Sequence, residues 1–184
     1  MRRIRHRVFR PLSPESDEEE RYGWCRVASP LELELRHDSV YSGSYLSLAF
    51  RVDRWRLPHA LLSAHLVEAE RELLEKKGKE RLGRTEKQEL RARVALSLKR
   101  QLLPHMQSYD FCWNLDSGVA RFWSHSKGLQ ERLAALFDAT FGMELAVDSP
   151  YVAALQRGLS AEQKAALNRA EQTPFHAAPL PKEG

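Results

Sequence analysis

The clearest constraint on the fold is the segment at residues 45–53, YLSLAFRVD, which has the pattern of a half-buried β-strand. Every second residue is large and apolar: Leu46, Leu48, Phe50 and Val52. The alternating positions hold Tyr45, Ser47, Ala49 and Arg51. Side chains alternate between the two faces of a strand, so the first set predicts a face that packs on a core.

A second strand signal is a hairpin over residues 108–124. Residues 108–115, SYDFCWNL, repeat the alternation and are followed by the turn residues Asp116, Ser117 and Gly118. Residues 119–124, VARFWS, then return as the second strand. We also expect a short strand at residues 143–147, MELAV.

Three apolar stripes predict helices. The first begins after Leu57 and Pro58 and continues to the basic connector 76–83, which we expect to be exposed. The second runs from about Glu86 to Leu103, opened by a capping box of Thr85 and Gln88. The third covers residues 127–141 and stops at Gly142, and a modest helix is expected over residues 160–172.

This order of elements predicts an α+β fold, with helices packed on one face of a mainly antiparallel sheet. We expect one α+β domain over residues 1–157, followed at residues 158–184 by the short helix and a disordered, proline-rich tail. The acidic run at residues 13–20, SPESDEEE, is interpreted as a solvated surface loop.

Charge is distributed unevenly along the 184 residues. The formal net charge is +4, yet residues 76–100 hold ten Lys or Arg against three Glu, and residues 1–10 hold five Arg and no acid. Attraction of an anion depends on where charge sits, so the small total leaves an anionic partner open. The sequence has no apolar run long enough for a membrane span, and its two cysteines make no disulfide framework, which favours the cytoplasm.

Nothing in the sequence predicts an enzyme. The seven histidines lack the spacing of a metal site, and no phosphate-binding or nucleophile motif is present, so we expect no metal and no cofactor. Asp110 and Asp116 lie too far apart on one strand to share an ion. Cys25 and Cys112 are interpreted as small buried residues rather than nucleophiles.

Two interpretations of the basic segment at residues 76–100 are open. The segment is either a surface for nucleic-acid phosphates or an ordinary solvated helix, neutralised in part by the pairs Glu80–Arg84 and Glu89–Arg93. For the first interpretation the candidate DNA-binding residues are Lys76, Lys77, Lys79, Arg81, Arg84, Lys87, Arg91, Lys99 and Arg100.

Several motifs in this region resemble the RdgC family of bacterial recombination-associated proteins. They are the helix start at residues 85–90, TEKQEL, the LLP at residues 102–104, the WNLDSG hairpin at residues 113–118 and the SHSK at residues 124–127. Phe9, Pro11, Gly23 and Trp24 also fit, and the resemblance covers about residues 4–154. The family's opening elements and second half have no counterpart in this sequence.

The resemblance implies a sequence-independent binder of duplex and single-stranded DNA that associates with the nucleoid and is not an enzyme. Family members form ring-shaped dimers and restrain RecA-type strand exchange, so it also implies a homo-oligomer. Whether this chain closes a ring stays open. The alternative is a protein-interaction or dimerisation module that has lost DNA binding, using Trp113, Phe122 or Trp123 if these are not core residues.

Overall fold

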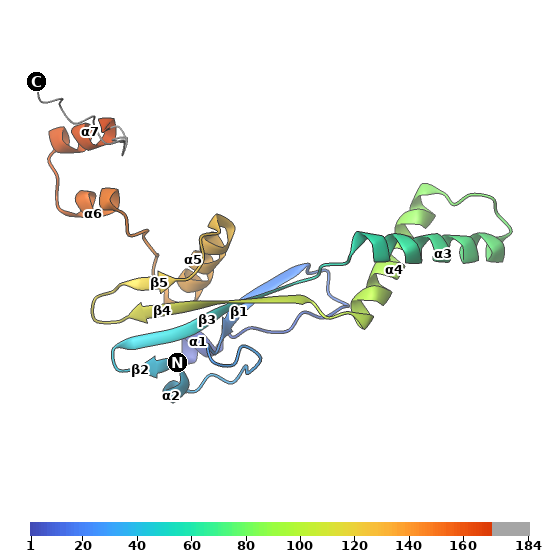
Figure 1. The fold of residues 1–184 in the computed structure, drawn as a ribbon, viewed down its shortest axis with the longest axis horizontal. Helices are drawn as coiled ribbons and strands as arrows, with labels where there is room; N and C mark the ends of the chain where they lie inside the picture. Colours follow the sequence, from blue (N-terminus) through green and yellow to red (C-terminus); the bar gives the residue numbers. More distant parts are fainter. Residues whose placement is uncertain (171–184) are drawn as a thin grey trace, which may run out of the picture. The chain divides into compact units, whose positions relative to one another are not determined.

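The computed structural model describes residues 1–170 and combines helices with one antiparallel sheet, which confirms the α+β class (Figure 1). The helices are α1 (Arg2–Arg5), α2 (His37–Val40), α3 (His59–Lys77), α4 (Arg84–Gln101), α5 (Lys127–Phe141), α6 (Pro150–Gln156) and α7 (Ala161–Arg169). The strands are β1 (Glu20–Cys25), β2 (Tyr41–Ser42), β3 (Tyr45–Arg54), β4 (His105–Asn114) and β5 (Ala120–Phe122). The predicted disordered tail lies outside the described residues.

Strand β3 is the centre of the sheet. The strand order is β1-β3-β4-β5, and β2 shares one edge of β3 with β1. Along the other edge β3 pairs with β4 over its full length, from Tyr45 opposite Asn114 to Arg54 opposite His105. The predicted hairpin is confirmed as β4 and β5.

One face of the sheet packs on α5 through aromatic side chains. Trp24, Phe50 and Phe111 are fully buried there, and the Phe111 ring contacts Phe137 of α5 with centroids 5.8 Å apart. The Trp24 indole N–H donates to the hydroxyl of Thr140 at 2.8 Å, so its buried polar atom is satisfied. Fully burying one large apolar side chain contributes about 1.5–3 kcal/mol. Because several such side chains are buried in this layer, it is the main core.

The opposite face of β3 is also covered, although its sequence pattern predicts a polar face. Arg51 is 7% exposed and Asp53 2% exposed. Two hydrogen bonds join the guanidinium to the Asp53 carboxylate, at 2.8 and 2.6 Å, and a third reaches the carbonyl of Pro30 at 3.0 Å. The Phe9 ring lies 4.1 Å from the guanidinium carbon. A buried charge needs such a partner because it has left water.

The N-terminal segment is held against β1 by its backbone. The Phe9 N–H donates to the Trp24 carbonyl at 2.8 Å, and the Trp24 N–H donates to the Arg7 carbonyl at 2.9 Å. Gly23 allows this approach, since a Cβ at that position would lie 2.6 Å from the Phe9 Cα. The segment therefore needs glycine beneath it for steric reasons.

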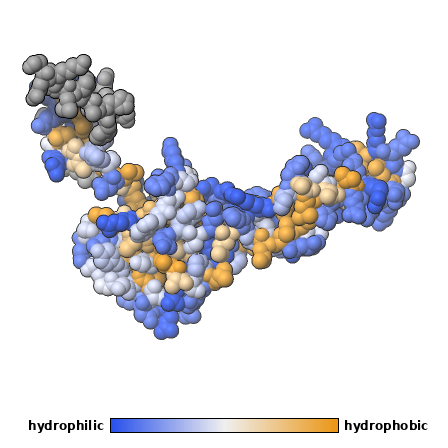
Figure 2. Space-filling model, viewed as in Figure 1, coloured by the Kyte–Doolittle hydropathy of each residue, from blue (hydrophilic) through white to orange (hydrophobic). Residues whose placement is uncertain are grey.

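Helices α3 and α4 pack against each other and not against a face of the sheet, so the expectation that the helices share one face holds only for α5 (Figure 1). Their buried contacts come from Leu62, Leu82, Leu90, Val94 and Leu98. Hydrophobic side chains are visible along this pair in Figure 2, bordered by hydrophilic ones. We call α3, α4 and their connection the helical hairpin.

Several element ends differ from the predictions. Helix α4 begins one residue before Thr85, and its cap is formed by Gly83 and Glu86, not by Thr85 and Gln88. The predicted exposed connector contains Leu82, which is buried because it closes the core of the helical hairpin.

Strand β1 was not predicted, since Glu20 was assigned to the acidic loop, and residues 143–147 form no strand. Helix α5 and its left-handed stop at Gly142 match the prediction.

The chain divides into two compact units, and the division falls after Glu144, before the predicted domain boundary at residue 157. In the second unit, the Ser149 hydroxyl caps α6 and the Ser160 hydroxyl caps α7. Helix α7 was predicted from the sequence, and helix α6 was not. No helix within residues 1–170 combines the length and the apolarity needed to cross a membrane.

The Asp53→Asn substitution tests the buried ion pair. It leaves the Arg51 guanidinium buried without a counter-charge, and we expect the free energy of unfolding to fall by about 3–5 kcal/mol. Urea denaturation followed by circular dichroism measures the loss. The matched control is Asp38→Asn, whose carboxylate pairs with Arg36 on the surface at 3.6 Å and should change stability by about 0.5 kcal/mol or less. Equal losses in the two variants would contradict a specific role for the buried pair.

Candidate nucleic-acid interface

All nine predicted DNA-binding residues lie on the helical hairpin. Lys76 and Lys77 end α3, Lys79 and Arg81 lie in the connection, and the other five are on α4. Eight of the nine are exposed and Lys99 is half-buried. The helical hairpin carries eleven cations against seven glutamates over residues 59–101, a net charge of +4, because α3 adds four glutamates beside the basic segment.

Five of the nine cations form ion pairs, so the basic segment is less free than its charge predicts. The pairs are Lys77–Glu86, Lys79–Glu86, Lys87–Glu70, Lys99–Glu19 and Arg100–Glu15. The two pairs predicted along the helices, Glu80–Arg84 and Glu89–Arg93, do not form among the described residues. The acids instead come from α3, from the first turn of α4 and from the acidic loop.

Glu86 is the most constrained of these acids. Its carboxylate accepts from Lys77 at 2.6 Å, from Lys79 at 3.2 Å and from the Gly83 backbone N–H at 2.9 Å. The hydrogen bond from Lys77, followed by those from Gly83 and Lys79, lowers the pKa of Glu86 from 4.5 to about 2. Glu86 therefore caps α4 and draws two of the predicted cations toward itself.

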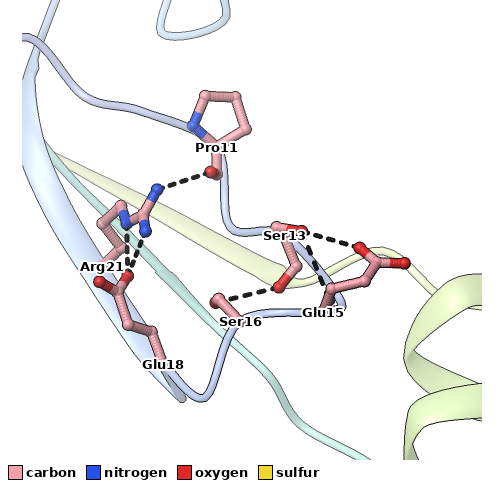
Figure 3. Close-up of polar contacts among 6 residues, drawn as sticks. All are labelled: Pro11, Ser13, Glu15, Ser16, Glu18 and Arg21. Atoms are coloured by element: carbon pink, nitrogen blue, oxygen red, sulfur yellow. Dashed lines mark hydrogen bonds and ion pairs between the residues drawn. The ribbon is translucent and has the colours of Figure 1, made fainter.

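The acidic loop holds the other end of α4. Glu19 accepts from Lys99 at 2.9 Å, and the Lys99 side chain is only 11% exposed, above the Trp55 ring. Glu15 accepts from Arg100 at 3.2 Å and from the Ser13 hydroxyl at 2.8 Å, the second contact being shown in Figure 3. The Ser13 hydroxyl, the Glu15 backbone N–H and Arg100 lower the pKa of the Glu15 carboxyl. The loop interpreted as a solubility feature thus contacts α4, and Lys99 is removed from the candidate surface.

A smaller basic surface remains on α4 once the cations held by Glu86 and by the acidic loop are set aside. Arg84, Lys87 and Arg91 are spaced three and four residues apart, which places them on one side of the helix. We call these three residues the basic face. Arg84 and Arg91 form no ion pair within residues 1–170, and Lys87 pairs with a single carboxylate, Glu70, at 2.9 Å.

The Lys87–Glu70 pair is weak enough for a phosphate to replace it. The Lys87 side chain is 56% exposed, and exposed ion pairs contribute about 0–1 kcal/mol because water and salt screen them. Two other acids of α3 lie at a different surface. Glu68 and Glu72 line a groove between the helices with Ser97 and Gln101, and no residue of the basic face lines it. Lys76 and Arg81 are also exposed and unpaired within the described part of the chain.

The histidines, cysteines and acidic residues are the other candidates for chemistry. Among residues 1–170, no three His, Cys, Asp or Glu side chains come together as a metal site. Burial raises the pKa of the Cys25 thiol to about 11, so the thiol is protonated near neutral pH. Cys112 is half-buried and near the Ser47 hydroxyl. His65 is exposed and lines the groove between α3 and α4.

No protein-family model matches this chain, and no curated protein sequence is significantly similar to it.

The Glu86 cap gives a prediction for pH. Its pKa is lower in the folded than in the unfolded chain, so its stabilising effect is complete above pH 4.5 and is lost as the pH falls toward about 2. NMR titration of the Glu86 side-chain carboxyl carbon should give a midpoint near 2, and Lys77→Met should raise it. Glu86→Gln should loosen the start of α4, measured by amide hydrogen exchange, whereas Glu89→Gln on the exposed side should not. A midpoint near 4.5 in the native protein would exclude this cap.

Proposed function

We propose that this chain is a non-catalytic DNA-binding protein that holds phosphates without reading base sequence. The observation that carries the proposal is the basic face, where Arg84 and Arg91 flank Lys87 and a single carboxylate from residues 1–170 forms an ion pair with the three. Arginine presents a planar fork of donors that matches phosphate oxygens, and such charge-assisted hydrogen bonds are stronger than neutral ones.

The spacing of the basic face suits a phosphate chain. Residues 84 and 91 are seven positions apart on α4, or about 10 Å at 1.5 Å per residue. Duplex DNA presents one phosphate charge for about every 1.7 Å of its axis, so several phosphates lie within that span. Contacts to phosphates carry no information about bases, which is why we propose binding that is independent of sequence.

The resemblance to RdgC proteins supports a more specific proposal. On that basis we place the protein in the cytoplasm, associated with the nucleoid, where it restrains RecA-type strand exchange by occupying DNA. This role needs a continuous hold on the DNA, and a homo-oligomer would supply it by repeating the basic face. The motifs at residues 85–90, 102–104 and 113–118 are the support for this part of the proposal.

The substitution pair Arg84→Gln and Arg91→Gln tests the basic face. Each phosphate contact adds about 0.9 to the slope of log K against log salt, so the double variant should reduce the steepness of that slope by about 1.8. Its affinity should fall about tenfold or more, since hydrogen bonds to charged groups are worth about 1.5 kcal/mol or more. Fluorescence anisotropy with labelled duplexes of unrelated sequence, between about 50 and 200 mM salt, measures both quantities.

The control is the double variant Arg26→Gln and Arg36→Gln, which removes the same charge from arginines paired with Glu32 and Asp38. It should leave the slope near that of the wild type. A wild type that does not bind at low salt, or a basic-face variant with the same slope as the control, would refute the proposed site. Strong preference for one duplex sequence would refute its sequence independence.

A second candidate function, a protein-interaction module, is favoured by Trp123. Trp113 and Phe122 contact core aromatic rings, but Trp123 follows the edge strand β5 and is 59% exposed. Exposed tryptophans are frequent anchors of protein interfaces. An open edge strand can also pair with another chain.

Trp123→Ala tests this second candidate. If a second copy docks at the edge of the sheet, the variant should convert a dimer to a monomer in size-exclusion chromatography with light scattering. Leu31→Ala is the control, because Leu31 is 72% exposed and belongs to none of the strands. A wild type that is monomeric over the accessible concentration range would argue against self-association at this edge.

A further inference from the structure

A second concentration of positive charge lies outside the helical hairpin. Residues 2–10, which we call the arginine arm, contain Arg2, Arg3, Arg5, Arg7 and Arg10 and no acidic residue. All five arginines are exposed. Among residues 1–170, Arg3 is the only one of the five whose guanidinium donates a hydrogen bond to another element, reaching the Phe141 carbonyl at 2.9 Å. Four guanidinium groups are therefore available to solvent.

The backbone of the arginine arm is anchored, so these charges are displayed from a fixed support. Ile4 and Phe9 are each 1% exposed. The two backbone hydrogen bonds to Trp24 and the close contact over Gly23 fix the positions of residues 7–9. An anchored group loses less conformational entropy on binding a ligand than a loose tail does.

Two carboxylates beside the arginine arm, Glu18 and Glu20, are already occupied by other residues. Arg21 donates to Glu18 at 2.5 Å and also to the Pro11 carbonyl at 3.0 Å (Figure 3). Glu20 forms ion pairs with Arg54 and Arg132. Arg2, Arg5, Arg7 and Arg10 form no ion pair with any residue from 1 to 170, so their charge is not neutralised within that range.

Two grooves border the arm. Arg7 and Arg10 line one of about 550 Å³, which is also lined by Arg21, by Leu136 of α5 and by the ion-paired carboxylates of Glu18 and Glu20. Arg5 and Arg10 line the other, of about 440 Å³, where the exposed Glu34 is the facing carboxylate. Arg10 borders both grooves, so an extended anion could pass from one to the other along it.

We propose that the arginine arm is a second phosphate-contacting surface, which binds the sugar–phosphate backbone of DNA independently of the basic face. This inference rests on the proposed function for the identity of the polyanion, but on separate residues for the site. Like charges held together repel one another, and a phosphate chain relieves that repulsion while it accepts the guanidinium donors. The basic segment of the helical hairpin supplies fewer free cations than its sequence predicts, and the arm adds four.

The double variant Arg7→Gln and Arg10→Gln tests the second surface against Arg84→Gln with Arg91→Gln and against the paired-arginine control, Arg26→Gln with Arg36→Gln. All three remove two positive charges. In the anisotropy titration we expect the arm variant to reduce the steepness of the salt slope by about 1.8 and the affinity about tenfold, with the control near the wild type. Combining the arm and basic-face changes should reduce the slope by about 3.6.

The outcomes separate the two proposals. An arm variant that behaves like the control, while the basic-face variant loses affinity, overturns the arm and leaves the proposed function standing. Loss in the arm variant alone supports the arm and overturns the basic face. A wild type that does not bind DNA overturns both. Binding to vesicles of anionic phospholipid that the arm variant abolishes, with control-like DNA affinity, assigns the arm to membranes and also overturns the inference.

Folding of the variants is checked by thermal unfolding in the absence of DNA. Removing two mutually repelling charges should leave the melting temperature unchanged or raise it. If the arm variant unfolds, Arg2→Gln with Arg5→Gln provides the same test on the exposed side of the short helix α1. Equal DNA affinity of that folded variant and the control would overturn the inference.

Discussion

The structure of residues 1–144 depends on the burial of strand β3, which is complete over residues 48–53. It is hydrogen-bonded at both edges and covered on both faces, by α5 on one side and by the N-terminal segment and the residues near Pro30 on the other. A strand in that position has no water to solvate a charged side chain. The two hydrogen bonds between Arg51 and Asp53 satisfy this constraint, and the Phe9 ring packs on the Arg51 guanidinium. The docking of the arginine arm follows from the same arrangement, because Phe9 belongs to the arm.

The helical hairpin obeys a different constraint. It buries its own apolar stripe between two helices, so its outer surface is free to carry charge. That surface is divided. Glu86 pairs with Lys77 and Lys79 at the tip, and the acidic loop pairs with Lys99 and Arg100 at the end of α4. The basic face between them has three cations opposed by one paired carboxylate, Glu70. Ion pairing thus selects a few cations from a long basic segment. A phosphate ligand would meet a short, defined surface and not a uniformly basic helix.

Much of the fold was predictable because it follows from local patterns. The alternation in β3 and β4, the turn at Gly118 and the stripe of α5 depend on residues close together in sequence. Strand β1 was missed because GWC is too short to show an alternation and follows an acidic run. The location of the candidate site on the helical hairpin was predictable, but which of its cations are paired with acids was not. Glu19 and Glu70 lie 80 and 17 positions from the lysines they bind, and no periodicity connects them.

The sequence by itself determined the class of fold, the amphipathic helices and the two places where positive charge accumulates. These follow from composition and period, which act over a few residues. Only the tertiary structure decided which charges stay free. It paired Lys99 with the acidic loop, buried Arg51 beside Asp53 and left the arginines of the arginine arm without an ion pair among residues 1–170. The physical reason is that neutralisation depends on distance in space, and chain folding brings acids from remote segments to some cations and not to others.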